Sequence, residues 1–140
     1  MTHPASSLTS IVHVALTVTD LGRSVDWYTQ VLGLDRVTVV PHAGGEGVIL
    51  ATPDRRVWWA LHRHDQQSGL PFSVRQTGLD HVALLVDSDA DLDRWQQHLD
   101  QATVHHEAIQ PLPDFGMRAL VFYDPDGIPV ELLAYVEADR

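Results

Sequence analysis

Two imidazoles and one carboxylate are the residues best suited to chemistry in this sequence. His13 and His81 each fall in a predicted apolar strand, and Glu131 stands between Val130 and Leu132. A buried polar side chain costs free energy unless it is hydrogen-bonded, paired or bound to a metal. Two neutral imidazoles and a carboxylate suit Fe, Mn, Ni or Zn, with coordination positions left open for substrate and water. We therefore predict a divalent metal site with these ligands, and an ion pair of Glu131 with an Arg or His is the structural alternative.

The two histidines begin two copies of one short sequence. Residues 13–18 (HVALTV) and 81–86 (HVALLV) agree at five of six positions, and a helix signal follows each copy. Such a repeat indicates a duplicated structural module. A pseudo-twofold relation between the modules would bring His13 and His81 together at their junction.

A fourth ligand would come from the last strand of the first module. His62 follows His13 at nearly the spacing at which Glu131 follows His81, which favours His62. Counting from the proline turn that precedes each of these strands points instead to Trp59. Side chains alternate along a strand, so His62 and His64 share one face. The sequence leaves open which of these two histidines, if either, reaches the site.

The elements that must position these residues follow the same order twice. In the first module, residues 11–64, Asp20 is the predicted helix N-cap and Gly33 ends the helix. Pro41 should stop the second strand, which places His42 in a glycine-rich connection. The module therefore reads as strand, helix and three strands. Its strands are predicted at residues 11–18, 36–40, 46–51 and 57–64.

The second module, residues 78–136, repeats this order. Ser88 or Asp89 should cap its helix, and residues 124–127 (DPDG) form a turn before the last strand. Residues 1–10 read as a loose tail and residues 65–77 as a linker, within one compact domain. The fold class is thus α+β with two tandem βαβββ modules. The strands are predicted at residues 78–86, 104–109, 117–123 and 128–136.

Composition narrows the functions open to the chain. The 140 residues carry a net charge of −10, which argues against a nucleic-acid partner. The absence of cysteine excludes disulfides and thiolate ligands. No apolar run approaches the roughly 18 residues of a membrane span, and the N-terminus lacks a secretory signal, so we expect a cytoplasmic protein without a membrane partner. The other histidines should be solvated surface residues: His3, His42, His98, His105 and His106.

At these residues the chain resembles the vicinal oxygen chelate superfamily of glyoxalase I, bleomycin-resistance and fosfomycin-resistance proteins and extradiol dioxygenases. The similar stretches are residues 13–21, 24–28, 31–34, 78–83 and 123–132, and the resemblance covers roughly residues 11–136. It implies paired βαβββ modules forming an open, curved mixed sheet around a divalent metal. The family ligands would map to His13, His81 and Glu131. The remaining family position lacks a clear glutamate or glutamine, and His62 is its candidate.

The resemblance also implies a function. Such proteins chelate vicinal oxygens of a small molecule through the metal, which acts as a Lewis acid and template. We expect a small metal-dependent lyase or dioxygenase, with Glu131 or a histidine as the base that moves a proton. A metal-free drug-binding protein of the bleomycin-resistance kind is the alternative. Open strand edges need covering and, with the resemblance, predict a homodimer.

Overall fold

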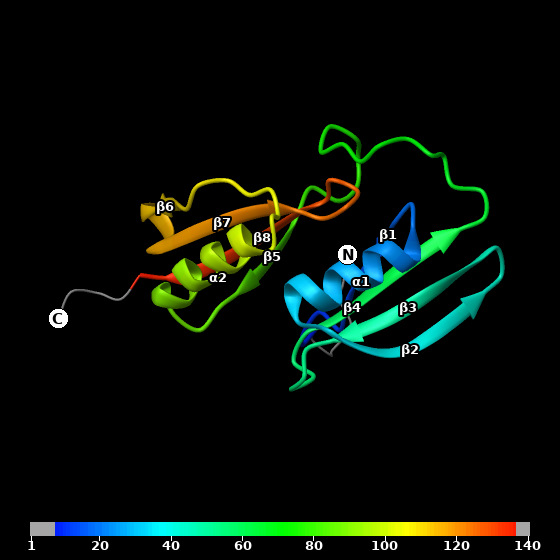
Figure 1. Ribbon diagram of the computed structural model, residues 1–140, viewed down its shortest axis with the longest axis horizontal. Helices are drawn as coiled ribbons and strands as arrows, with labels where there is room; N and C mark the ends of the chain where they lie inside the picture. The colour runs from blue at the N-terminus through cyan, green and yellow to red at the C-terminus, as the bar shows by residue number, and fades with distance from the viewer. Residues whose placement is uncertain (1–7, 137–140) are drawn as a thin grey trace, which may run out of the picture. The chain divides into compact units, whose positions relative to one another are not determined.

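The computed structural model describes residues 8–136 (Figure 1). The chain separates into two compact units, with the division between Gln67 and Ser68. Each unit contains a four-stranded mixed sheet and one long helix, in the order strand, helix and three strands. The α+β class and the tandem βαβββ modules predicted from the sequence are therefore confirmed.

Unit 1 is the first of these modules. Its sheet has the order β1-β4-β3-β2, with β1 parallel to β4 and the other neighbours antiparallel. The strands β1 and β2 are consequently the two edges of the sheet. The elements are β1 (Val14–Thr17), α1 (Leu21–Leu32), β2 (Asp35–His42), β3 (Gly45–Ala51) and β4 (Trp58–His64).

Unit 2 repeats the topology. Its sheet has the order β5-β8-β7-β6, again with the first strand parallel to the last. Within the described part of the chain, neither long helix has the length and apolarity needed to cross a bilayer. The elements are β5 (Val82–Leu85), α2 (Asp89–Gln101), β6 (Gln110–Leu112), the 3-10 helix η1 (Pro113–Phe115), β7 (Met117–Tyr123) and β8 (Pro129–Tyr135).

The helix α1 begins and ends where the sequence predicts. The Asp20 carboxylate accepts a hydrogen bond from the Arg23 backbone N–H at 2.9 Å, and Gly33 adopts a left-handed φ of 66°. Its apolar side packs on the sheet of unit 1. There the ring centroids of Tyr28 and Trp59 are 5.2 Å apart. Both rings are fully buried, so this contact forms the centre of the unit 1 core.

Each sheet turns one face toward its helix, and this decides where polar side chains can lie. In β4, Trp59 and Leu61 are buried on the α1 side, so alternation places His62 on the opposite face. In β8, Val130 and Leu132 are buried on the α2 side, so Glu131 lies on the opposite face. We call this opposite face of each sheet its open face.

Among the strand boundaries that differ from the sequence prediction are those of β2 and β6. The strand β2 continues through Pro41 and includes His42, because an edge strand tolerates a residue without a backbone N–H. Residues 104–109 were predicted to be a strand, but only an isolated bridge between His106 and Phe122 forms there, and the strand β6 begins at Gln110. Pairing partners, rather than local propensity, set both boundaries.

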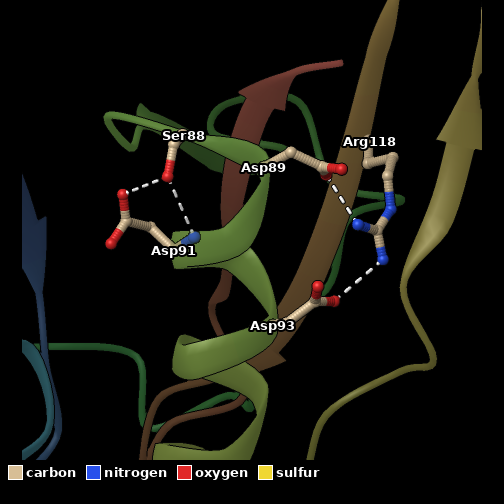
Figure 2. A network of polar contacts seen from close by, with 5 residues as sticks. All are labelled: Ser88, Asp89, Asp91, Asp93 and Arg118. Atoms are coloured by element: carbon tan, nitrogen blue, oxygen red, sulfur yellow. Dashed lines mark hydrogen bonds and ion pairs between the residues drawn. The ribbon is translucent and has the colours of Figure 1, made fainter. Parts of the chain in front are cut away.

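Arg118 joins the helix of unit 2 to its sheet (Figure 2). It extends from β7 and donates to the carboxylates of Asp89 at 2.6 Å and Asp93 at 2.9 Å, both on α2. Ser88 caps this helix, accepting from the Asp91 backbone N–H at 3.2 Å and donating to its carboxylate at 2.6 Å. Hydrogen bonds between charged partners are stronger than neutral ones, and the Arg118 side chain is only 27% exposed.

We expect Arg118→Gln to lower the free energy of unfolding by about 1 kcal/mol, because it leaves two partly exposed carboxylates without their cation. Urea denaturation of the full chain measures this change. Arg94→Gln is the matched control, since Arg94 pairs with Asp91 on the exposed surface of the same helix. An equal loss in both variants would contradict the structural role of Arg118.

Candidate functional site

Unit 2 brings two of the predicted ligands together. The Nε2 atom of His81 lies 3.5 Å from Oε2 of Glu131, on the open face of the sheet. The register explains the meeting, because Ala83 pairs with Glu131 and His81 lies two residues before Ala83 on the same face. The Glu131 side chain is 20% exposed, so the carboxylate is largely shielded from water.

Asp80 holds the His81 ring from the other side. Its Oδ1 atom lies 2.6 Å from Nδ1 of His81. An ionised carboxylate can only accept a hydrogen bond, so Nδ1 of His81 must be the donor. In a neutral imidazole the ring hydrogen is therefore on Nδ1. In the neutral ring Nε2 carries the lone pair, and in the protonated ring the same 3.5 Å contact is the ion pair of Glu131 with a histidine that was the structural alternative. A carboxylate that orients an imidazole in this way is a usual companion of a metal-ligating histidine.

His13 has the equivalent place in unit 1, one residue before β1 as His81 is one residue before β5. Both side chains are exposed. The sequence prediction that both lie inside buried strands is therefore wrong, because ladder pairing with the last strand of each module starts only at Val14 and Val82. Of the three predicted ligands, only Glu131 is shielded enough from water that its burial calls for a charged or metal partner.

The strand register identifies the position in unit 1 that matches Glu131. In unit 2, Ala83 pairs with Glu131, and in unit 1 the corresponding Ala15 pairs with Ala60. Ala60 has no ligating side chain. His62 pairs with Thr17, one step further along the same face. The register thus pairs Ala15, the residue that matches Ala83, with Ala60 and not with His62. A fourth metal ligand at His62 stays a prediction.

His62 belongs instead to a group of three imidazoles on the open face of unit 1. Its Nδ1 atom lies 3.3 Å from Nε2 of His42, at the end of β2. The ring centroids are 5.3 Å apart for His42 and His62, 5.0 Å for His42 and His64, and 6.2 Å for His62 and His64. We call these three residues the histidine cluster. They line a hollow of about 460 Å³ together with Ala15, Leu16, Thr17 and Val40.

His42 was missed as a site residue because the sequence places it in a loop. The detectable signal was the two-residue hairpin connection after it, which pairs His42 with Gly45 and continues the strand. His106 was also expected to be solvated. Its side chain is only 13% exposed, and its Nε2 atom donates to Asp100 at 3.0 Å.

Two imidazoles have opposite shifts in pKa. Partial burial lowers the pKa of His62 from its usual 6.5, and the neighbouring imidazoles of His42, His64 and His13 lower it further. The pKa of His106 is raised, first by its hydrogen bond to the Glu107 carbonyl at 2.8 Å and then by Asp100. Near neutral pH, His62 is thus kept uncharged while His106 is held closer to protonation.

No three metal-ligating side chains of residues 8–136 are gathered into a ready-made ion site. The predicted ligands divide between the units, with His13 in unit 1 and His81 and Glu131 in unit 2. The structure shows two separate groups: His81 with Glu131 in unit 2, and the histidine cluster in unit 1. The three-ligand set as a whole stays a prediction.

Comparison with known proteins identifies relatives over most of the chain. The model of the glyoxalase/bleomycin resistance protein/dioxygenase superfamily matches residues 10–132. The metallothiol transferase FosB of Staphylococcus epidermidis is 26% identical over 133 residues, which cover 95% of this chain and 87% of that protein.

Solved structures agree in fold. A glyoxylase/bleomycin resistance protein/dioxygenase domain from Frankia sp. EAN1pec is 30% identical, with a TM-score of 0.83 over 92% of this chain and 99% of that one. The fosfomycin resistance protein FosX from Listeria monocytogenes, solved with Mn(II) and sulfate, has a TM-score of 0.66 at 15% identity over 91% of this chain and 93% of that one. At this low identity the second likeness concerns the fold alone.

The two shifted imidazoles give a test by NMR titration of the metal-free protein. His62 should titrate below 6.5 and His106 above it, and Asp100→Asn should return only His106 toward 6.5. The His62 shift destabilises the fold as pH falls below 6.5, since the unfolded chain binds the proton first. The His106 contribution is fully present below 6.5 and is lost as pH rises through its folded pKa. Coincident midpoints for the two rings would contradict these environments.

Proposed function

The chain belongs to the glyoxalase/bleomycin resistance protein/dioxygenase superfamily, and on this premise we propose that it is a metal-dependent enzyme acting on a small, oxygen-rich molecule. The cofactor is a divalent cation such as Fe, Mn, Ni or Zn, with His13, His81 and Glu131 as its ligands. The observation that carries the proposal is the oriented pair of His81 and Glu131 in unit 2.

The donor atoms of this pair fit a metal ion. Ligand atoms about 2.0–2.2 Å from a cation lie roughly 3–3.5 Å from each other, and Nε2 of His81 is 3.5 Å from Oε2 of Glu131. Asp80 fixes the ring so that Nε2 carries the lone pair. Ala83, which pairs with Glu131 in the neighbouring strand, has a small side chain. His13, in the matching place of unit 1, supplies the third donor.

The relatives support a metal function. FosB is named a metallothiol transferase, and FosX was crystallised with Mn(II). Two imidazoles and one carboxylate leave positions for substrate oxygens in an octahedral or five-coordinate shell. A drug-sequestering protein would need neither the carboxylate nor the imidazole held in one orientation. For these reasons catalysis is preferred over metal-free binding.

Each residue of the pair has a defined part in such a reaction. When bound, the cation supplies Lewis-acid stabilisation of negative charge on a substrate oxygen. Glu131 is the carboxylate able to accept a proton from substrate, and its shielding from water favours direct transfer. Asp80 is a positioning residue, because it keeps the proton of His81 on Nδ1 and the ring in place. The small-molecule substrate would bind on the open face.

The homodimer predicted from the sequence is part of the same proposal. Among residues 8–136, the strands β1 and β2 form the edges of the sheet in unit 1, and β5 and β6 form those in unit 2. Pairing or covering of such edges by a second copy would protect them from unwanted association.

Metal content tests the proposed site. In protein purified without a histidine tag, we expect His81→Ala and Glu131→Ala each to hold about one divalent ion per chain fewer than wild type, because each removes a ligand. Elemental analysis after dialysis measures the content. His98→Gln is the control, since His98 lies on α2 away from the open face. Equal contents of Fe, Mn, Ni and Zn in wild type, His81→Ala and Glu131→Ala would overturn the enzyme proposal and favour the drug-binding alternative.

Asp80→Asn tests the orienting role of the carboxylate. We expect the affinity for the divalent ion to fall about 10- to 100-fold while the fold is unchanged, because His81 loses the acceptor that fixes its tautomer. Competition with a chromophoric chelator gives the affinity, and circular dichroism checks the fold. Asp87→Asn, an exposed change before α2, serves as a control of equal charge. Equal affinities in wild type and Asp80→Asn would contradict this role.

A further inference from the structure

The histidine cluster of unit 1 has a geometry of its own that the proposed catalytic site does not use. His42 ends β2 and His62 and His64 lie at the end of β4, on either side of β3 and on the open face of one sheet. We propose that these three imidazoles form a second metal site, which binds a divalent transition-metal ion such as zinc. Its ligands differ from His13, His81 and Glu131, and it uses His62, the candidate fourth ligand of that set, for an ion of its own.

The spacing of the nitrogen atoms supports a shared ion. A tetrahedral zinc ion with Zn–N bonds of about 2.0–2.1 Å holds its ligand nitrogens about 3.3–3.4 Å apart. The Nδ1 atom of His62 and the Nε2 atom of His42 are separated by 3.3 Å. An ion between these atoms would take the place of the single proton that joins the two rings in the metal-free state.

The spacing of the rings agrees with this arrangement. Three imidazoles on one tetrahedral ion have centroids about 5.2 Å apart, since each centroid lies about 1.1 Å beyond its ligating nitrogen. The observed separations of 5.3 Å and 5.0 Å from His42 match this value. His64 is 6.2 Å from His62, and its exposed side chain can rotate to close that distance. Two donors are thus in place and the third needs only a change of rotamer.

The neighbouring strand leaves room for the rings. Gly47 of β3 pairs with His62, and a Cβ atom at Gly47 would lie 2.5 Å from two atoms of the His62 ring. A Cβ at Gly45 would lie 2.9 Å from Cε1 of His42, although the Arg63 carbonyl also demands glycine there. The His62 imidazole lies over Gly47 and leaves no room for a side chain there, which explains the glycine at this position.

The register separates this cluster from the family position. The residue of unit 1 that matches Glu131 is Ala60, whereas His62 lies two residues further along β4. A zinc ion prefers imidazole nitrogen, while the site with Glu131 adds an oxygen donor that suits harder cations. The two donor sets are therefore expected to differ in their preferred metal.

The test uses full-length protein without a histidine tag, in a background carrying His13→Ala, His81→Ala and Glu131→Ala. This background removes the three proposed ligands His13, His81 and Glu131 and keeps the histidine cluster. Calorimetric titration with ZnCl₂ should show one ion bound per chain. His42→Gln, His62→Gln and His64→Gln, added one at a time, should each lower the affinity at least tenfold. His98→Gln, added to the same background, should leave the affinity unchanged.

Cobalt(II) supplies a second readout. Bound to the background protein, it should give the intense visible absorption of a four-coordinate ion, and the band should disappear in His62→Gln. Circular dichroism and urea midpoints confirm that each compared variant is folded, and the three separate substitutions keep the test valid if one of them is not. Absence of zinc binding in the folded background, or binding that survives all three substitutions, would overturn the second site. Neither result bears on the ion at His81 and Glu131, which is measured as the difference in metal content between wild type and His81→Ala.

Discussion

The packing of one helix against one face of each four-stranded sheet is the constraint on which the molecule depends. In unit 1 the buried contact between Tyr28 and Trp59 fixes which side of β4 faces α1. Because side chains alternate along a strand, this contact also sends His62 to the open face. The same reasoning in unit 2 buries Val130 beneath α2 and leaves Glu131 on the open face. Apolar packing thus selects the surface on which chemistry is possible.

The two modules share a topology and differ in how their open faces are used. Unit 2 holds Asp80 and His81 just before β5 and the Glu131 carboxylate on β8. In unit 1 the position that matches Glu131 is Ala60, and three imidazoles gather further along the sheet. The repeat therefore preserves the scaffold while the ligating groups diverge. A carboxylate and an imidazole favour a different range of cations from three imidazoles, so the divergence has a chemical consequence.

Electrostatic environment distinguishes these groups further. His62 lies among other imidazoles and is partly buried, so its charged form is disfavoured and its pKa is lowered. His81 instead lies between two carboxylates, which is the environment expected of a metal ligand or a proton carrier. Arg118 and its two aspartates lie on the side of the unit 2 sheet that α2 covers. Their charges are therefore not on the open face, where Glu131 lies.

The sequence by itself determined the repeat, the element order and the ends of α1, because these depend on local patterns: an N-cap at Asp20, a left-handed Gly33 and apolar residues at strand or helix spacing. It also pointed to His81 and Glu131 as neighbours. Only the tertiary structure decided that Ala60 matches Glu131, that His42 belongs to a strand and that Asp80 orients His81. Register and edge position depend on pairing between strands distant in sequence, and no local pattern contains that information.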